Sequence, residues 1–247
     1  MLQVEGLTKL FLLHHLHGRM VIALDDVSFT VRAGEHVAIV GASGAGKSTL
    51  LRCLHRTDRP TAGGIWYRRA SAAVVDLTTL PDLDMADLRE REIGYVSQFL
   101  RAEPRRTTLD VVCRAAIQRG IDRTDASEVA VDALRRLGIA EDLFGVHPTV
   151  LAGGEKQRVN LAVGTVGHPP RLLLLDDPVA SLDPVNRAAV LRWLDELRTE
   201  STSIVSVFHD AAAIGNVADR VVELSAGRLT RVCHRDDASI HDPLEVL

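Results

Sequence analysis

Residues 41–49 read Gly41-Ala42-Ser43-Gly44-Ala45-Gly46-Lys47-Ser48-Thr49 and match the pattern G-x-x-x-x-G-K-[ST]. Glycines let consecutive backbone N–H groups of such a loop turn inward around phosphate groups. The pattern also places a lysine where it can reach the β and γ phosphates of a nucleotide, and a hydroxyl where it can bind Mg²⁺. The residues expected to hold the phosphates are Gly41, Ser43, Gly44, Ala45, Gly46, Lys47, Ser48 and Thr49, and Ser48 is also expected to bind Mg²⁺.

The segments on either side of this loop support the match. Residues 36–40 form a short apolar run, as in a central strand of a covered parallel sheet, and Leu50, Leu51 and Leu54 follow at helical spacing. A helix that begins near Lys47 directs its positive end toward the same phosphates. A chance match of four fixed positions occurs in roughly 1% of chains of this length, so the accompanying strand and helix argue against coincidence.

Two later apolar runs, residues 171–175 and 204–208, have the same character as residues 36–40. The first run is followed by Asp176, which places a carboxylate at the carboxyl edge of the predicted sheet, where ligands bind in open α/β folds. An apolar strand that ends in aspartate is weak evidence by itself. Beside the phosphate loop, however, Asp176 is expected to hold Mg²⁺ from the side opposite Ser48.

The remaining chain has a different texture. Residues 24–31 alternate apolar and polar side chains, which predicts a half-buried antiparallel strand, and residues 221–230 predict a closing hairpin. Between residues 99 and 168 the pattern is helical: Thr107 and Asp110 have the spacing of a capping box, and Gly138 predicts a helix end. The polar stretch 231–247 is expected to be loosely ordered.

Composition excludes several classes of protein. The 247 residues carry a net charge of −4, without the basic excess of a general nucleic-acid binder. Apolar runs stay far below the ~18 residues that span a bilayer, and the N-terminus lacks a secretory pattern. Three widely spaced cysteines fit a reducing compartment, so we expect a cytoplasmic protein. A metal site at His14, His15 and His17 is disfavoured, because no nearby cysteine or carboxylate completes a ligand set.

Further segments, in order along the chain, resemble motifs of the ABC ATPase family. Residues 151–155 (Leu-Ala-Gly-Gly-Glu) are similar to its signature loop, and residues 181–183 (Ser-Leu-Asp) to its D-loop. Gln98 stands where that family has its Q-loop glutamine, His209 where it has its switch histidine, and Phe11 where an aromatic ring stacks on adenine. The resemblance implies an α/β P-loop fold over residues 1–230. It would have a mostly parallel central sheet flanked by helices, an antiparallel β subdomain, a helical subdomain at roughly 99–168, and a polar tail at 231–247.

The resemblance also implies a mechanism. Two subunits pack head to tail, and each ATP, with its Mg²⁺, lies between one phosphate loop and the other subunit's signature loop. Gly153 and Gly154 offer backbone N–H groups to the partner's γ-phosphate. Gln98 binds Mg²⁺, and His209 contacts the γ-phosphate and the attacking water. The residues that the resemblance adds to the nucleotide site are Phe11, Ala152, Gly153, Gly154 and Asp183, and the catalytic set it implies is Lys47, Gln98, Asp177 and His209.

Two positions depart from the family pattern. Asp177 follows Asp176 where the family has a glutamate that orients the attacking water, and its side chain is one methylene shorter. Ala152 stands where the signature loop has a serine, so one hydroxyl donor is missing. A misplacement of ~1 Å can cost ~10²-fold in rate, and a lost donor ~10²–10³-fold in analogous acyl-transfer sites. We therefore expect slow hydrolysis by the isolated chain. A heterodimer with a different ABC subunit is favoured, with a homodimer as the alternative.

The narrowest resemblance is carried by residues 95–101 (Tyr-Val-Ser-Gln-Phe-Leu-Arg) and by Pro104-Arg105. These are similar to the PhnL-type subunits of bacterial carbon–phosphorus lyase systems, which implies a soluble lyase core as partner. The alternative is the ATP-binding subunit of a membrane transporter, peripheral at the inner membrane face and served by a separate permease. A P-loop kinase is disfavoured by the signature-like loop, and a chromosome-structure ATPase by the lack of a long heptad insertion.

Overall fold

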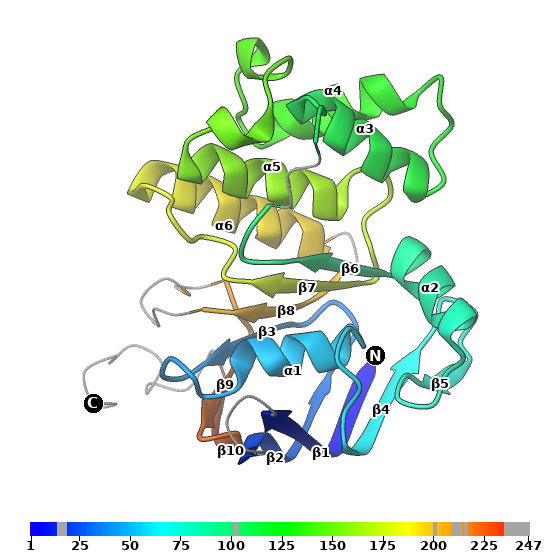
Figure 1. Ribbon diagram of the computed structural model, residues 1–247, viewed down its shortest axis with the longest axis vertical. Coiled ribbons are helices and arrows are strands. Elements are labelled where there is room, and N and C mark those ends of the chain that lie inside the picture. The colour runs from blue at the N-terminus through cyan, green and yellow to red at the C-terminus, as the bar shows by residue number, and fades with distance from the viewer. Residues whose placement is uncertain (14–18, 101–103, 200–201, 209–213, 215–216, 235–247) are drawn as a thin grey trace.

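The structure is a computed structural model that describes residues 1–13, 19–100, 104–199, 202–208, 214 and 217–234 (Figure 1). It contains two sheets. The four-stranded sheet has the order β2-β1-β4-β5, and the six-stranded sheet has the order β10-β9-β3-β8-β7-β6. The strands are β1 (Leu2–Leu13), β2 (Arg19–Val31), β3 (His36–Val40), β4 (Ala62–Arg68), β5 (Val74–Asp76), β6 (Ile93–Val96), β7 (Leu172–Asp176), β8 (Ser203–Val207), β9 (Arg220–Ser225) and β10 (Arg228–His234).

Helices cover both faces of the six-stranded sheet. Figure 1 shows α1 between that sheet and the antiparallel strands, while α5 and α6 lie on the opposite side with α3 and α4 beyond them. The helices are α1 (Lys47–Leu54), α2 (Asp82–Arg91), α3 (Thr108–Gln118), α4 (Ala126–Arg136), α5 (Gly153–Thr165) and α6 (Pro184–Thr199), with short 3-10 turns at Glu141–Leu143 and Pro148–Val150. The predicted fold class is therefore confirmed.

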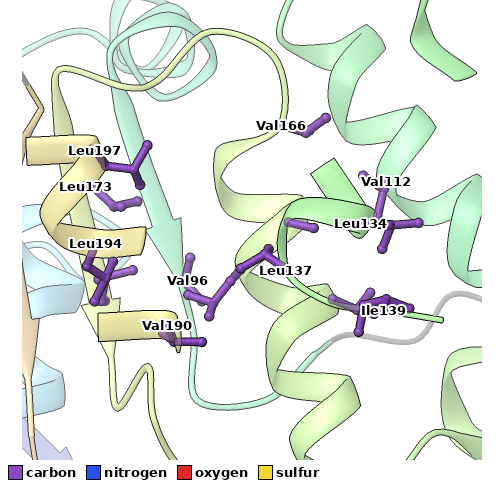
Figure 2. Close-up of a cluster of buried hydrophobic side chains, with 14 of the residues drawn as sticks. Val96, Val112, Leu134, Leu137, Ile139, Val166, Leu173, Val190, Leu194 and Leu197 are labelled. Atoms are coloured by element: carbon purple, nitrogen blue, oxygen red, sulfur yellow. The ribbon is translucent and has the colours of Figure 1, made fainter. Parts of the chain in front are cut away.

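Strands β3, β6, β7, β8 and β9 are parallel, and each contributes side chains to two cores. In β7, Leu172 and Leu174 pack toward α1 and the antiparallel sheet, whereas Leu173 and Leu175 pack toward the helices of the other face. This alternation follows from the two-residue repeat of a strand. Being apolar on both faces is what made these runs recognisable in the sequence. Figure 2 shows the second core, where Leu173 of β7 and Val190, Leu194 and Leu197 of α6 form part of one buried cluster.

The helical subdomain has the local signals expected of it. The Thr107 hydroxyl accepts a hydrogen bond from the Asp110 N–H at 3.1 Å, and the Asp110 carboxylate accepts one from the Thr107 N–H at 3.0 Å. This capping box begins α3. Gly138 follows α4 with φ of +67°, the left-handed conformation expected just beyond a helix end.

One expectation is wrong: the polar tail does not begin at residue 231. Arg231–His234 are the second half of β10, and Val232 pairs with Val222 of β9. Backbone pairing in a hairpin needs no apolar pattern, so the polar composition of this stretch did not indicate that the strand continues to His234. Residues 235–247 lie outside the described part of the chain, as do His14, His15, His17 and His209. Among the helices of the described residues, none has the length and hydrophobicity required to cross a bilayer.

Candidate functional site

Several of the predicted site residues lie at the carboxyl edge of the six-stranded sheet. Strands β3, β8, β7 and β6 are parallel neighbours in that order, so the segments that follow them begin side by side at one edge of the sheet. The phosphate loop follows β3, Asp176 ends β7, and Gln98 comes two residues after β6. His209 follows β8 but lies outside the described residues, so its role stays a prediction.

The glycines of the phosphate loop are required for two different reasons. Gly41 and Gly46 have φ of +144° and +104°, and a Cβ would lie 2.0 Å from the Leu224 carbonyl oxygen and 2.4 Å from the Ala23 carbonyl oxygen, respectively. Gly44 has φ of +79° but open space around it. Backbone conformation alone therefore selects glycine at 44, whereas at 41 and 46 the neighbouring chain also excludes a side chain.

Lys47 is buried, with only 4% of its surface exposed, and begins α1. Its Nζ donates to the carbonyl oxygens of Gly41 at 2.6 Å and Ala42 at 2.9 Å. Burial lowers the pKa of the Lys47 ammonium, and the negative charges of Asp176 and Asp177 oppose that shift. The cation is thus held inside the loop by weak neutral acceptors, which an incoming phosphate can outcompete.

The two residues expected to bind Mg²⁺ are in direct contact. The Ser48 hydroxyl donates to Asp176 Oδ1 at 3.0 Å, and Asp176 is buried at 6% exposure. Both groups are hard oxygen donors. Mg²⁺ in nucleotide sites is usually held by one or two such protein groups together with phosphates and water. The residues present therefore fit Mg²⁺, which when bound would neutralise charge on the β and γ phosphates.

Asp177 has its backbone fixed from three sides. Its φ is +52°, a left-handed conformation that aspartate tolerates better than most residues. Its N–H donates to the Val207 carbonyl at 3.1 Å, and its carbonyl accepts from the Ala180 N–H at 3.2 Å and from Gln157 Nε2 at 3.1 Å. Asp177 therefore lies immediately after Asp176, in a backbone held by β8, by the following turn and by α5.

The signature-like loop forms the start of α5. The Ala152 N–H donates to the Glu155 carboxylate at 2.8 Å, but alanine has no side-chain oxygen to cap the helix in return. Ala152 and Gly153 are exposed. A Cβ on Gly153 or Gly154 would lie 3.3 Å from the Ser181 Cβ or 3.2 Å from the Ser181 oxygen, so these glycines permit close packing on the D-loop-like segment. The loop is available to an external group on its outer side.

Asp183 lies at the other end of that segment and directly precedes α6. Its Oδ1 accepts from the backbone N–H groups of Val185 and Asn186, both at 3.0 Å. Hydrogen bonding, first of all from the Asn186 side chain, lowers the pKa of Asp183. Its contacts within the chain are those of a helix cap, and a part in the nucleotide site stays a prediction.

Gln98 is half-buried and borders a cavity of about 480 Å³ between β6, α5 and the D-loop-like segment. The cavity is also lined by Phe99, Gly153, Lys156, Gln157 and Ser181. Phe99 is 74% exposed at its mouth. Phe11, in contrast, lies in β1 opposite Val21, with Lys9 Nζ 4.8 Å from its ring centre, so the structure gives it a cation–π partner and leaves adenine stacking a prediction.

Two buried side-chain amides of α5 were not among the predicted site residues. Gln157 donates to the Asp177 carbonyl, and Asn160 donates to the Ser97 carbonyl, next to Gln98. Gln157 and Asn160 are 4% and 6% exposed. Their spacing of three places both on one helix face, and two polar residues on a face that must be buried are the signal that was overlooked.

Comparison with known proteins places these features in context. A family model described as ABC transporter matches residues 24–180. A lipoprotein-releasing system ATP-binding protein, LolD of Syntrophotalea carbinolica, is 36% identical over 231 residues, which cover 93% of this chain and 97% of LolD. A methionine import ATP-binding protein, MetN of Histophilus somni, is 34% identical over 232 residues, 93% of this chain but 64% of MetN.

Two further matches concern architecture. The macrolide export ATP-binding/permease protein MacB of Agrobacterium fabrum is 36% identical over 229 residues, and the chain spans only 33% of its length. Among solved structures, the dimeric bacterial ABC transporter cassette MJ0796 superposes with a TM-score of 0.87 at 26% identity, covering 96% of this chain and all of that one. A second structure of that cassette is a post-hydrolysis dimer bound to ADP and phosphate.

Proposed function

The chain belongs to the ABC transporter family, whose members bind ATP with Mg²⁺ and hydrolyse it, and on that premise we propose that it is the ATP-binding subunit of a membrane transporter. The observation that carries the ATP-binding part of this proposal is the contact between Ser48 and Asp176 beside the buried ammonium of Lys47, and the transporter part rests on the named relatives. Together these groups offer a cation and a hard oxygen pair to a Mg²⁺-bound triphosphate.

Dimerisation would complete the site. Ala152 and Gly153 are exposed at the start of α5, where the helix dipole and the N–H groups of the first turn favour an anion. In a head-to-tail pair this loop would meet the partner's nucleotide. The dimeric cassette that this chain superposes on supports that arrangement.

The partner proposed is a membrane permease, which would hold the subunit at the inner face of the membrane. LolD is named as part of a lipoprotein-releasing system, MetN as part of a methionine importer, and MacB combines its ATP-binding part with a permease. Phe99, exposed beside Gln98, would give such a partner an apolar contact near the Mg²⁺ site.

The departures at Asp177 and Ala152 affect different sites of a dimer. Asp177 belongs to the site built on this chain's own phosphate loop, and Ala152 to the site built on the partner's. A homodimer would carry both changes in each site, whereas a heterodimer with an intact partner would carry one in each. Slow hydrolysis by the isolated chain and a different ABC subunit as natural partner therefore remain part of the proposal.

A soluble carbon–phosphorus lyase core is the second candidate partner. It rests on the resemblance of residues 95–101 and Pro104-Arg105, which border the surface carrying Phe99. None of the relatives named above is a lyase subunit, so the transporter has the better support.

Isolation of the intact complex tests the choice. The full-length tagged chain should be recovered from its native cells, from both the soluble fraction and detergent-solubilised membranes, beside a Phe99→Asp variant that places a charge on the proposed contact. Recovery of a multi-spanning permease by the wild type, reduced in the variant, would support the transporter. Recovery of soluble enzyme subunits and no membrane protein would replace it with the lyase function.

A further inference from the structure

Helix α5 carries residues that belong to, or contact, each of the two proposed nucleotide sites. Its first turn carries Gly153 and Gly154, which would bind the nucleotide of the partner. One turn further along, Gln157 donates its side-chain amide to the Asp177 carbonyl at 3.1 Å. Asp177 in turn belongs to this chain's own nucleotide site. A single rigid helix therefore connects the loop that would sense one nucleotide with the residue proposed to orient water at the other.

We infer that Gln157 is a positioning residue that couples the two nucleotide sites. Through its bond to the Asp177 carbonyl, it sets the orientation of the Asp177 carboxylate according to whether the signature loop is engaged by the partner's nucleotide. This inference rests on the proposed function, since it requires a dimer with ATP at the interface.

The bond is placed where a small displacement has a large effect. The Asp177 carbonyl has two donors, Gln157 Nε2 and the Ala180 N–H, and its N–H is held by Val207 of β8. The β8 bond anchors one end of this residue to the sheet, while the Gln157 bond ties the other end to α5. A shift of α5 would therefore rotate the Asp177 peptide against a fixed anchor and redirect the side chain. Because the aspartate side chain is one methylene shorter than that of glutamate, we expect the rate of ATP hydrolysis to depend strongly on where its carboxylate is placed.

Gln157 does more than pack the interior of the protein. At 4% exposure, its amide costs free energy to bury unless it is hydrogen-bonded, and the bond it makes is to the backbone of Asp177. The cavity of about 480 Å³ borders the same residue, together with Gly153 and Lys156, and gives this side of α5 room to move. On the side of Ser181, an added Cβ on Gly153 or Gly154 would lie 3.2–3.3 Å from that residue, so the start of α5 packs closely on the D-loop-like segment.

A double-mutant cycle separates coupling from simple support. Hydrolysis of labelled ATP and the Kd for Mg-ATP are measured on the full chain for wild type, Gln157→Leu, Asp177→Asn and the double variant. Asparagine keeps the size and the backbone bonds of Asp177 but removes the carboxylate. Arg158→Leu is the matched control, because Arg158 also donates from α5 to backbone carbonyls and none of them belongs to Asp177. Its acceptors are Leu137 at 3.1 Å, Gly138 at 2.7 Å and, within the helix, Gly154 at 3.4 Å.

We expect Gln157→Leu to lower kcat about 10-fold with the Kd for Mg-ATP unchanged, and to have no further effect once Asp177 is asparagine. Arg158→Leu should lower kcat equally in both backgrounds or leave it unchanged. An equal loss from Gln157→Leu in both backgrounds, or no loss at all, would overturn the inference while leaving the proposed function intact. Failure of the wild-type chain to bind Mg-ATP would instead overturn the proposed function, and the inference with it.

Discussion

The Ser48 hydroxyl donates a hydrogen bond to Asp176 Oδ1 at 3.0 Å, although 128 positions separate the two residues. Ser48 lies in the first turn of α1, and Asp176 ends β7, two strands away from β3 across β8. The packing of the sheet therefore places the two oxygens side by side. Such preorganisation avoids the free-energy cost of bringing the ligands together at the moment of binding.

Replacing Asp176 by asparagine should weaken Mg²⁺ binding, so that ATP hydrolysis needs a higher Mg²⁺ concentration. Charge stabilisation by the metal is worth several kcal/mol, so we expect turnover to fall by at least about 100-fold. Hydrolysis is measured while Mg²⁺ is titrated. Asp132→Asn is the control, because that exposed carboxylate pairs with Arg136 on α4 at 2.8 Å and should leave the Mg²⁺ titration unchanged. A variant at 176 with wild-type Mg²⁺ response would exclude Asp176 as the metal ligand.

Lengthening Asp177 to glutamate should raise the hydrolysis rate of the isolated chain. The extra methylene brings the carboxylate nearer to the position from which the family orients water, and we expect an increase of about 10-fold from improved placement. Steady-state rates at saturating Mg-ATP are compared for wild type, Asp177→Glu and Asp177→Asn, the last of which should be slowest. Brisk wild-type turnover that the glutamate does not change would show that Asp177 already reaches the water, and would remove the main support for a heterodimer.

Two glycines of the phosphate loop should differ in the stability they contribute. Gly46→Ala should lower the free energy of unfolding by more than about 2 kcal/mol, because it combines a left-handed backbone with a Cβ 2.4 Å from the Ala23 carbonyl oxygen. Gly44→Ala has the strained φ but open space, so about 1 kcal/mol is expected. Urea unfolding without nucleotide measures both. Equal losses of unfolding free energy in the two variants would mean that the contact with Ala23 does not contribute to the destabilisation.

Stability should decline as the pH falls below neutrality because of His36. This residue is fully buried in β3, its Nε2 lies 2.6 Å from the Ser206 hydroxyl, and burial lowers its pKa from 6.5 to about 4. The unfolded chain binds a proton near pH 6.5, whereas the folded chain resists it until about pH 4. Above pH 6.5, His36 is neutral in both states and does not lower the free energy of unfolding. As the pH falls from 6.5 to 4, protonation of His36 in the unfolded chain lowers the free energy of unfolding by about 3 kcal/mol.

The pH test compares unfolding free energies between pH 7.5 and 4.5 for the wild type, His36→Gln and His168→Gln. His168 is exposed and serves as the control. The slope should flatten in the His36 variant and stay unchanged in the His168 variant. An unchanged slope in the His36 variant would assign the acid sensitivity to other groups, such as His55, whose pKa burial also lowers to about 4.

The contiguous motifs and local signals were readable from the sequence alone. The phosphate loop, the strand before it, the helix after it, the capping box at Thr107 and the stop at Gly138 each depend on residues within a few positions of one another. Backbone conformation and hydrogen bonding act over that range, so local order specifies them. Asp176 was also found, because an apolar strand that ends in a carboxylate is itself a local pattern.

Only the tertiary structure decided which distant residues meet. Strand order and register bring Gln157 to Asp177, and pairing with β9 makes Arg231–His234 a strand although the sequence indicated a tail. Such contacts depend on how elements pack across long loops, and no short-range pattern encodes them. The sequence thus determined the chemistry that each segment offers, and the packing of the sheet and helices determined which of those groups act together.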